Sequence, residues 1–189
     1  MKAMQIVSFD GPASGLRYQD APTPEPGPGQ IAVDVDHAGV GYVEALFAEG
    51  LVPIDLPWTP GLEMSGRVRA LGDGVDGYRV GDAVVALTIT GGGGYGQVAV
   101  APAELVTPLP AGLDPVLAAA VPANSTTALV ALEEIAHLRR GESVLVHAAA
   151  GGLGSQMGQV ARLLGASRIV GITRSEAKRQ EILDLGYDE

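Results

Sequence analysis

A glycine-rich turn is the part of this sequence whose residue types and spacing are best suited to chemistry. Residues 149–154 read AAGGLG, which follows the pattern G-x-G-x-x-G except for alanine at the first glycine position. Glycines in such a turn let backbone N–H groups approach a pyrophosphate, and the helix that follows directs its positive end at the same anion. The pattern predicts a dinucleotide site whose cofactor contacts are Ala149, Gly151, Gly152, Leu153 and Gly154.

The segments on either side of the turn supply the strand, helix and strand that such a site requires. Residues 143–147 (SVLVH) and 168–173 (RIVGIT) are short apolar runs that predict strands, and Met157 to Leu164 carry apolar side chains at helical spacing. A glycine pattern alone is equally compatible with an ordinary strand-to-helix turn. The complete βαβ context favours the nucleotide-binding unit.

The residues at the end of the second strand indicate which dinucleotide is expected. Sites for NAD usually place an acidic residue there to bind the ribose 2′-hydroxyl, whereas this chain has Thr173, Arg174 and Ser175, followed by Lys178. Hydroxyls and cations suit a 2′-phosphate, so we predict that these four residues bind NADPH. The alternative is that the cations only solvate the helix predicted over residues 175–186, where acidic side chains lie one turn away.

Composition excludes several other classes of protein. The 189 residues contain no cysteine and only three scattered histidines, His37, His137 and His147, so we expect no disulfide, no thiol nucleophile and no metal site. The formal net charge of −10 argues against nucleic acid as a partner, because binding a phosphate backbone requires a basic face. No apolar stretch approaches the roughly 20 residues of a membrane span, and no signal peptide is visible. We expect no membrane partner and a cytoplasmic location.

Short β-like runs separated by glycine and proline occupy the first part of the chain and predict the strands of a small, strongly turned barrel. Residues 21–30 (APTPEPGPGQ) predict an extended connector, because proline and glycine preclude a regular helix there. The expected strands are 4–9, 30–40, 64–72, 82–89 and 96–101.

The pattern changes at Asp114, after which two helical stretches are predicted on either side of Pro122, the second capped by Ser125 and ended by Gly141. We therefore expect a first domain over 1–124 and a second over 125–189. A doubly wound dinucleotide fold has about six strands, and the second domain offers two, so we expect it to be incomplete. Its open strand edge would then pair with a partner chain, in a homo-oligomer such as a dimer.

The order of these features resembles the medium-chain dehydrogenase/reductase superfamily, specifically its zinc-free quinone oxidoreductase branch. The resemblance rests on residues 60–66 (PGLEMSG), 80–84 (VGDAV), the Thr127-Ala128 pair that opens a predicted helix, and the glycine turn. It implies an α/β fold: a GroES-like β-barrel catalytic domain followed by a partial Rossmann dinucleotide-binding domain, with NADPH as cofactor. Thr127 is then expected to contact the cofactor, or simply to cap its helix.

Catalytic residues are harder to identify. Relatives often carry asparagine where this chain has Gly41, and a tyrosine near Leu46 or Leu51, so Tyr42 is the nearest phenol and a weak catalytic candidate. The alternative is a packing tyrosine on a barrel strand. His147 either faces the cofactor or packs at a strand end, and Glu63 is interpreted as a structural acid between the domains.

The resemblance and the residues together predict an NADPH-dependent, metal-independent oxidoreductase that transfers hydride to a quinone or another conjugated carbonyl acceptor. Such an acceptor delocalises the arriving charge, so positioning and a weak acid suffice. Two alternatives remain open. One is an enoyl-thioester reductase of the polyketide or fatty-acid type, and the other is a non-catalytic NADPH-binding protein.

Overall fold

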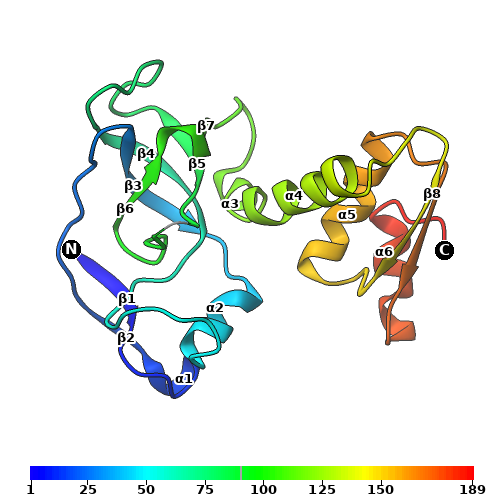
Figure 1. Ribbon diagram of the computed structural model, residues 1–189, viewed down its shortest axis with the longest axis horizontal. Helices are drawn as coiled ribbons and strands as arrows, with labels where there is room; N and C mark the ends of the chain where they lie inside the picture. Colours follow the sequence, from blue (N-terminus) through cyan, green and yellow to red (C-terminus); the bar gives the residue numbers. More distant parts are fainter. Residues whose placement is uncertain (90) are drawn as a thin grey trace. The chain divides into compact units, whose positions relative to one another are not determined.

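Alternating apolar side chains fold residues 30–108 into a curled antiparallel sheet. In the computed structural model, which describes residues 1–89 and 91–189, this sheet has five strands in the order β6-β3-β4-β5-β7 (Figure 1). Its inward side chains, among them Ile31, Met64 and Val68, form the core of a first compact unit, Met1–Pro122. The strands are β3 (Gln30–Ala38), β4 (Glu63–Leu71), β5 (Ala83–Leu87), β6 (Val98–Pro102) and β7 (Val106–Pro108).

A two-stranded antiparallel sheet and several short helices complete this unit. The smaller sheet pairs β1 (Lys2–Ile6) with β2 (Leu16–Asp20). Residues 21–27 adopt neither helix nor strand, as their prolines predict. The helical elements are α1 (Pro12–Gly15), α2 (Tyr42–Ala48), the 3₁₀ turn η1 (Ala103–Leu105) and α3 (Pro115–Ala118).

The five strands expected from the sequence are present, with shifts of a few residues at their ends. The expectation that Tyr42 packs on a barrel strand is wrong, since Tyr42 begins α2 and is 79% exposed. A helix starts here because the Glu44 carboxylate accepts a hydrogen bond from the Gly41 N–H at 3.0 Å, which satisfies a donor that the helix itself leaves free. The strands β2 and β7 and the helix α2 were not expected.

The second compact unit, Ala123–Glu189, is built on two parallel strands. β8 (Ser143–His147) pairs in register with β9 (Arg168–Ile172), and α5 (Gly152–Leu163) connects them, so the predicted βαβ unit is confirmed (Figure 1). Ile169, Ile182 and Tyr187 lie in the core between sheet and helices. The other elements are α4 (Pro122–Leu129), the π-helical η2 (Val130–Ile135), the 3₁₀ turn η3 (Glu176–Lys178) and α6 (Arg179–Asp184).

The helical stretches on either side of Pro122 are present, but their ends differ from those expected. Pro122 separates α3 from α4 as predicted, but it is itself the first residue of α4, and Ser125 lies within α4 and does not cap it. The helical path ends at Ile135, earlier than the expected Gly141, because His137 enters the left-handed region with φ 52°. Gly141, with φ 87°, instead turns the chain toward β8. No helix in the described part of the chain is long and apolar enough to cross a bilayer.

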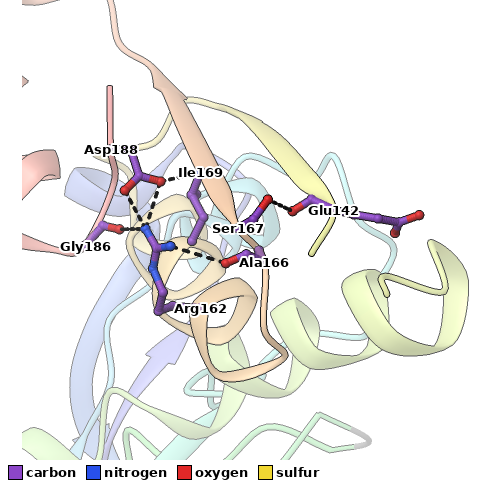
Figure 2. A network of polar contacts seen from close by, with 7 residues as sticks. All are labelled: Glu142, Arg162, Ala166, Ser167, Ile169, Gly186 and Asp188. Carbon is purple, nitrogen blue, oxygen red and sulfur yellow. Dashed lines mark hydrogen bonds and ion pairs between the residues drawn. The ribbon is translucent and has the colours of Figure 1, made fainter. Parts of the chain in front are cut away.

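Arg162 ties the last residues of this unit to α5 and β9 (Figure 2). Its guanidinium donates to both carboxylate oxygens of Asp188 at 2.8 Å and to the carbonyl oxygens of Gly186 and Ala166 at 3.0 and 3.2 Å. Asp188 in turn accepts from the Ile169 N–H at 2.7 Å. The segment after α6 is therefore held against the sheet by a charged network at the surface.

Replacing Gly66 by alanine tests the packing of the first unit. A Cβ at Gly66 would lie 2.1 Å from the Asp34 carbonyl oxygen on the neighbouring strand, so the sheet would have to move. We expect Gly66→Ala to lower the free energy of unfolding by about 1–3 kcal/mol in urea denaturation. Gly91→Ala is the control, because its Cβ would meet no atom within 4 Å, and it should change stability by less than about 0.5 kcal/mol. Equal effects of the two substitutions would contradict this packing.

Asp188 should make the stability of the chain depend on pH on the acid side. The Ile169 N–H and the Arg162 guanidinium hold the pKa of Asp188 below its ordinary value. A carboxyl group with a lowered folded-state pKa stabilises the fold above its unfolded pKa, and this contribution is lost as pH falls through the folded value. Asp188→Asn should therefore reduce stability at pH 7 and weaken the loss of stability below about pH 4.

The measurement is the urea midpoint as a function of pH. Glu134→Gln removes an exposed carboxylate from η2 of the same unit and is the control, for which we expect the native pH profile. If Asp188→Asn had the native pH profile, the network around Asp188 would not contribute to the pH dependence of stability.

Candidate functional site

A cavity of about 530 Å³ opens at the carboxyl ends of β8 and β9. Ligands of open parallel sheets bind at this edge, because the loops that leave the strands there surround a common space. The cavity is lined by His147, Ala148, Ala150, Gly151, Ile172, Thr173, Arg174, Ser175 and Lys178.

The glycine turn that adjoins the cavity carries free backbone donors. Gly151 is the N-cap of α5, and no side chain of the described residues caps this helix. The N–H groups of the first helical turn, at Gly152, Leu153 and Gly154, have no intrahelical acceptor by geometry. The start of α5 is therefore suited to an anion such as a pyrophosphate.

Close packing explains the last glycine of the turn and the alanine at its first position. A Cβ at Gly154 would lie 2.3 Å from the Ala148 carbonyl oxygen, so glycine is needed for α5 to start this close to β8. Ala148 itself has φ 52°, a left-handed conformation that is rare for alanine and is found mostly at functional turns. Ala149 is fully buried, and its N–H donates to the Ile172 carbonyl at 3.0 Å, so its side chain belongs to the core.

Two cations stand at the opposite wall of the cavity. Arg174 and Lys178 are exposed, and neither takes part in the ion pairs found within residues 1–89 and 91–189. Thr173 and Ser175 are half-buried beside them, and the Thr173 hydroxyl accepts from the Ser175 N–H at 3.3 Å. Because no carboxylate neutralises these cations, this wall can attract a phosphate.

The structure brings part of the predicted site together. Gly151 and the group Thr173, Arg174, Ser175 and Lys178 line the cavity, whereas Ala149, Gly152, Leu153 and Gly154 belong to the adjoining turn without lining it. Their contact with a cofactor stays a prediction.

Thr127 does not line this cavity. It lies near the end of α4, not at its start, so the expectation that Thr127 opens or caps a helix is wrong. Its hydroxyl donates to the Ala123 carbonyl one turn earlier, at 2.7 Å. A cofactor contact through Thr127 also stays a prediction.

Sequence reasoning missed other residues around the cavity. Ala148, Ala150 and Ile172 line it, and His147 is exposed in it, so the interpretation of His147 as a packed strand-end residue is wrong. Asn124 of α4 also lies beside the turn, because a Cβ at Gly152 would come within 3.2 Å of its Nδ2 atom. The positions of His147 and Ile172 at strand ends indicate these two residues from the sequence. Asn124 lies near the turn because of tertiary packing, which no local sequence pattern predicts.

Buried acids in the first unit have structural partners. Glu44 is 8% exposed and accepts hydrogen bonds from the N–H groups of Gly41 and Leu62 at 3.0 and 3.3 Å. Glu63 is also buried, and a Cβ at Gly39 would lie 2.7 Å from its carboxyl carbon. Burial, and secondarily these two carboxylates, raises the pKa of Tyr95. Within the described residues no cluster of three or more His, Cys, Asp or Glu side chains is arranged for a metal ion.

Comparisons with known proteins agree with this architecture. Residues 27–111 match the family of alcohol dehydrogenase GroES-like domains. The chain is 36% identical over 186 residues to the mouse synaptic vesicle membrane protein VAT-1 homolog-like, covering 97% of this chain and 44% of the relative. It is 35% identical over 191 residues to rat quinone oxidoreductase, covering 100% of this chain and 57% of the relative. The chain thus spans about half the length of these relatives.

Solved structures share the fold of the chain. A mycobacterial protein in complex with NADPH superposes with a TM-score of 0.88 at 33% identity, covering 100% of this chain and 57% of that one. The CurK enoyl reductase superposes with a TM-score of 0.89 at 28% identity, covering 100% of this chain and 58% of that one. These findings confirm the predicted fold class, a GroES-like domain followed by part of a Rossmann domain. The chain belongs to the medium-chain dehydrogenase/reductase superfamily, in its quinone oxidoreductase-like branch.

Proposed function

We propose that this chain binds NADPH in the cavity at the carboxyl ends of β8 and β9, as part of an oxidoreductase that reduces a quinone or another conjugated carbonyl compound. The observation that carries the proposal is the pairing of two anion-binding walls around one cavity. Gly151 lines the cavity next to the free N–H groups of the adjoining turn at the start of α5, and Arg174 and Lys178 line it after β9. In this assignment 1–124 is the catalytic domain and 125–189 the cofactor-binding part.

The two sides of the cavity suit the pyrophosphate and the 2′-phosphate of NADPH. A pyrophosphate at the glycine turn meets backbone donors and the positive end of α5. A 2′-phosphate near the end of β9 meets Arg174 and Lys178, where an NAD site would carry an acidic residue. In a chain with a formal net charge of −10, these unpaired cations also give the cavity a local field of the opposite sign.

Hydride transfer to a conjugated acceptor fits the residues that are present. Bound NADPH would supply the hydride, and the chain would bind it, orient it and keep water away. A zinc-dependent reduction needs cysteine or clustered histidine ligands, and this chain has no cysteine. The quinone oxidoreductases among its relatives support this choice of acceptor. Tyr42, which is exposed on α2, stays a weak catalytic candidate.

An enoyl-thioester reductase is the second candidate, favoured by the likeness to the CurK enoyl reductase. The two candidates share the hydride donor and differ in the acceptor. Rates of NADPH oxidation with a small quinone and with a crotonyl thioester distinguish them. A faster rate with the thioester would favour the enoyl-thioester reductase over the quinone reductase.

Arg174 and Lys178 should determine the preference for NADPH over NADH. A hydrogen bond to a charged group contributes about 1.5–3 kcal/mol, and because both cations are exposed we expect the lower end, a loss of about tenfold in NADPH affinity for Arg174→Ala or Lys178→Ala. NADH affinity should stay within about twofold. Fluorescence titration of both cofactors measures the two affinities.

Arg179→Ala is the matched control, because it removes an exposed cation of the same segment that does not line the cavity. It should leave both affinities near those of the native chain. Equal binding of NADPH and NADH by the native chain would contradict the assignment of the 2′-phosphate site.

Reductase activity should survive metal chelation. The proposed cofactor binding uses backbone donors and cations. His37, His137 and His147 do not form a cluster within the described residues. Dialysis against EDTA should therefore leave the rate of quinone reduction unchanged. Loss of activity on chelation, with recovery on adding zinc, would refute the metal-independent mechanism.

A further inference from the structure

Tyr187 fills a space between α5 and β9 that two glycines leave open. A Cβ at Gly158 would lie 2.3 Å from the Cε2 atom of the tyrosine ring, and a Cβ at Gly171 would lie 2.8 Å from its Cδ1 atom. Tyr187 is only 4% exposed. The ring therefore occupies the positions that two side chains would otherwise take, one on the helix and one on the strand.

The hydroxyl of Tyr187 reaches the glycine turn. It donates to the Gly154 carbonyl oxygen at 2.5 Å, in a buried hydrogen bond between residues 33 positions apart. Burial raises the pKa of Tyr187 above its ordinary value of 10.0, so the hydroxyl stays a donor at neutral pH. Across the same peptide group, the Ser155 N–H donates to the Gly151 carbonyl at 2.9 Å. The peptide plane that joins Gly154 to Ser155 is thus fixed at both of its polar atoms.

The neighbours of Tyr187 hold the ring in place. Arg162 binds the Gly186 carbonyl and the Asp188 carboxylate on either side of it, and the Asp188 N–H donates to the Ile169 carbonyl at 2.8 Å (Figure 2). The phenol therefore projects from a backbone anchored to both α5 and β9. Because the backbone on both sides of Tyr187 is anchored, its hydroxyl would restrain the first turn of α5.

We propose that Tyr187 is a positioning residue for the cofactor: its hydroxyl locks the first turn of α5, so that the N–H groups at Gly152, Leu153 and Gly154 remain aligned for the pyrophosphate. The proposal rests on the proposed NADPH site and deepens it. Tyr187 does not line the cavity and would act on it through the hydrogen bond to Gly154. The affinity for the pyrophosphate should therefore depend on a side chain outside the cavity lining.

Tyr187→Phe separates this role from packing, because it keeps the ring and removes only the hydroxyl. NADPH and NADH carry the same pyrophosphate, so both should bind about three- to tenfold more weakly, with their affinity ratio unchanged. Arg174→Ala, in contrast, should change that ratio. In the chain without cofactor, exchange of the Ser155 amide, which is hydrogen-bonded to the Gly151 carbonyl, should become faster in Tyr187→Phe.

Tyr78→Phe is the matched control. It removes a hydroxyl that donates to the Val106 carbonyl at 2.5 Å in the first unit, so it should leave both cofactor affinities and the exchange of the Ser155 amide unchanged. Gly158→Ala is a second variant that displaces the phenol without deleting it, and it should weaken both cofactors equally as well.

The outcomes distinguish this proposal from the proposed function. If the native chain binds both cofactors and Tyr187→Phe binds them equally well, Tyr187 is a packing residue and the proposal is overturned while the cofactor site stands. Unchanged exchange of the Ser155 amide overturns it in the same way. If the native chain binds neither cofactor, the proposed function fails and the proposal fails with it.

Discussion

The close approach of α5 to β8 and β9 is the constraint on which the second unit depends. Gly154 lets α5 begin against the Ala148 carbonyl at the end of β8, and Gly158 and Gly171 leave room for the ring of Tyr187 between α5 and β9. A methyl group at any of these positions would meet atoms at less than 3.0 Å, a separation that forces the neighbouring element to move. Glycines therefore determine both where the helix begins and how the tyrosine ring fits between helix and strand.

This approach also fixes where the helix begins. Because α5 starts at the carboxyl ends of the two strands, its free N–H groups lie beside the cavity. The residues that follow β9 form another wall of the cavity. Arg174 and Lys178 reach that wall because the chain turns into η3 immediately after the strand. The position of the free N–H groups thus follows from the packing of α5 against β8, and the position of Arg174 and Lys178 follows from where β9 ends.

The sequence predicted the elements around this site better than the contacts between distant segments. Period-two alternation and the run from strand to glycine turn to helix are local patterns, so β8, α5, β9, β1 and four strands of the five-stranded sheet were identified, whereas β7 was not. Thr127 and Tyr42 were misplaced because helix boundaries depend on capping and on tertiary contacts, such as the bond from Gly41 to Glu44. Tyr187 was missed as a site residue because its contact with Gly154 joins residues 33 positions apart.

Two features of the turn are energetically unfavourable, so its stability depends on contacts made elsewhere in the unit. A left-handed alanine at residue 148 and a helix start without a capping side chain each cost about 1 kcal/mol or more, and both lie at the same end of α5. The core around Ile169 and Tyr187 and the network of Arg162 lie elsewhere in the unit and offset these costs. An anion bound at the turn would satisfy the free N–H groups that the fold leaves open. Binding and folding of this unit are then linked, since a ligand that binds only the folded state stabilises it in proportion to the logarithm of its concentration over its Kd.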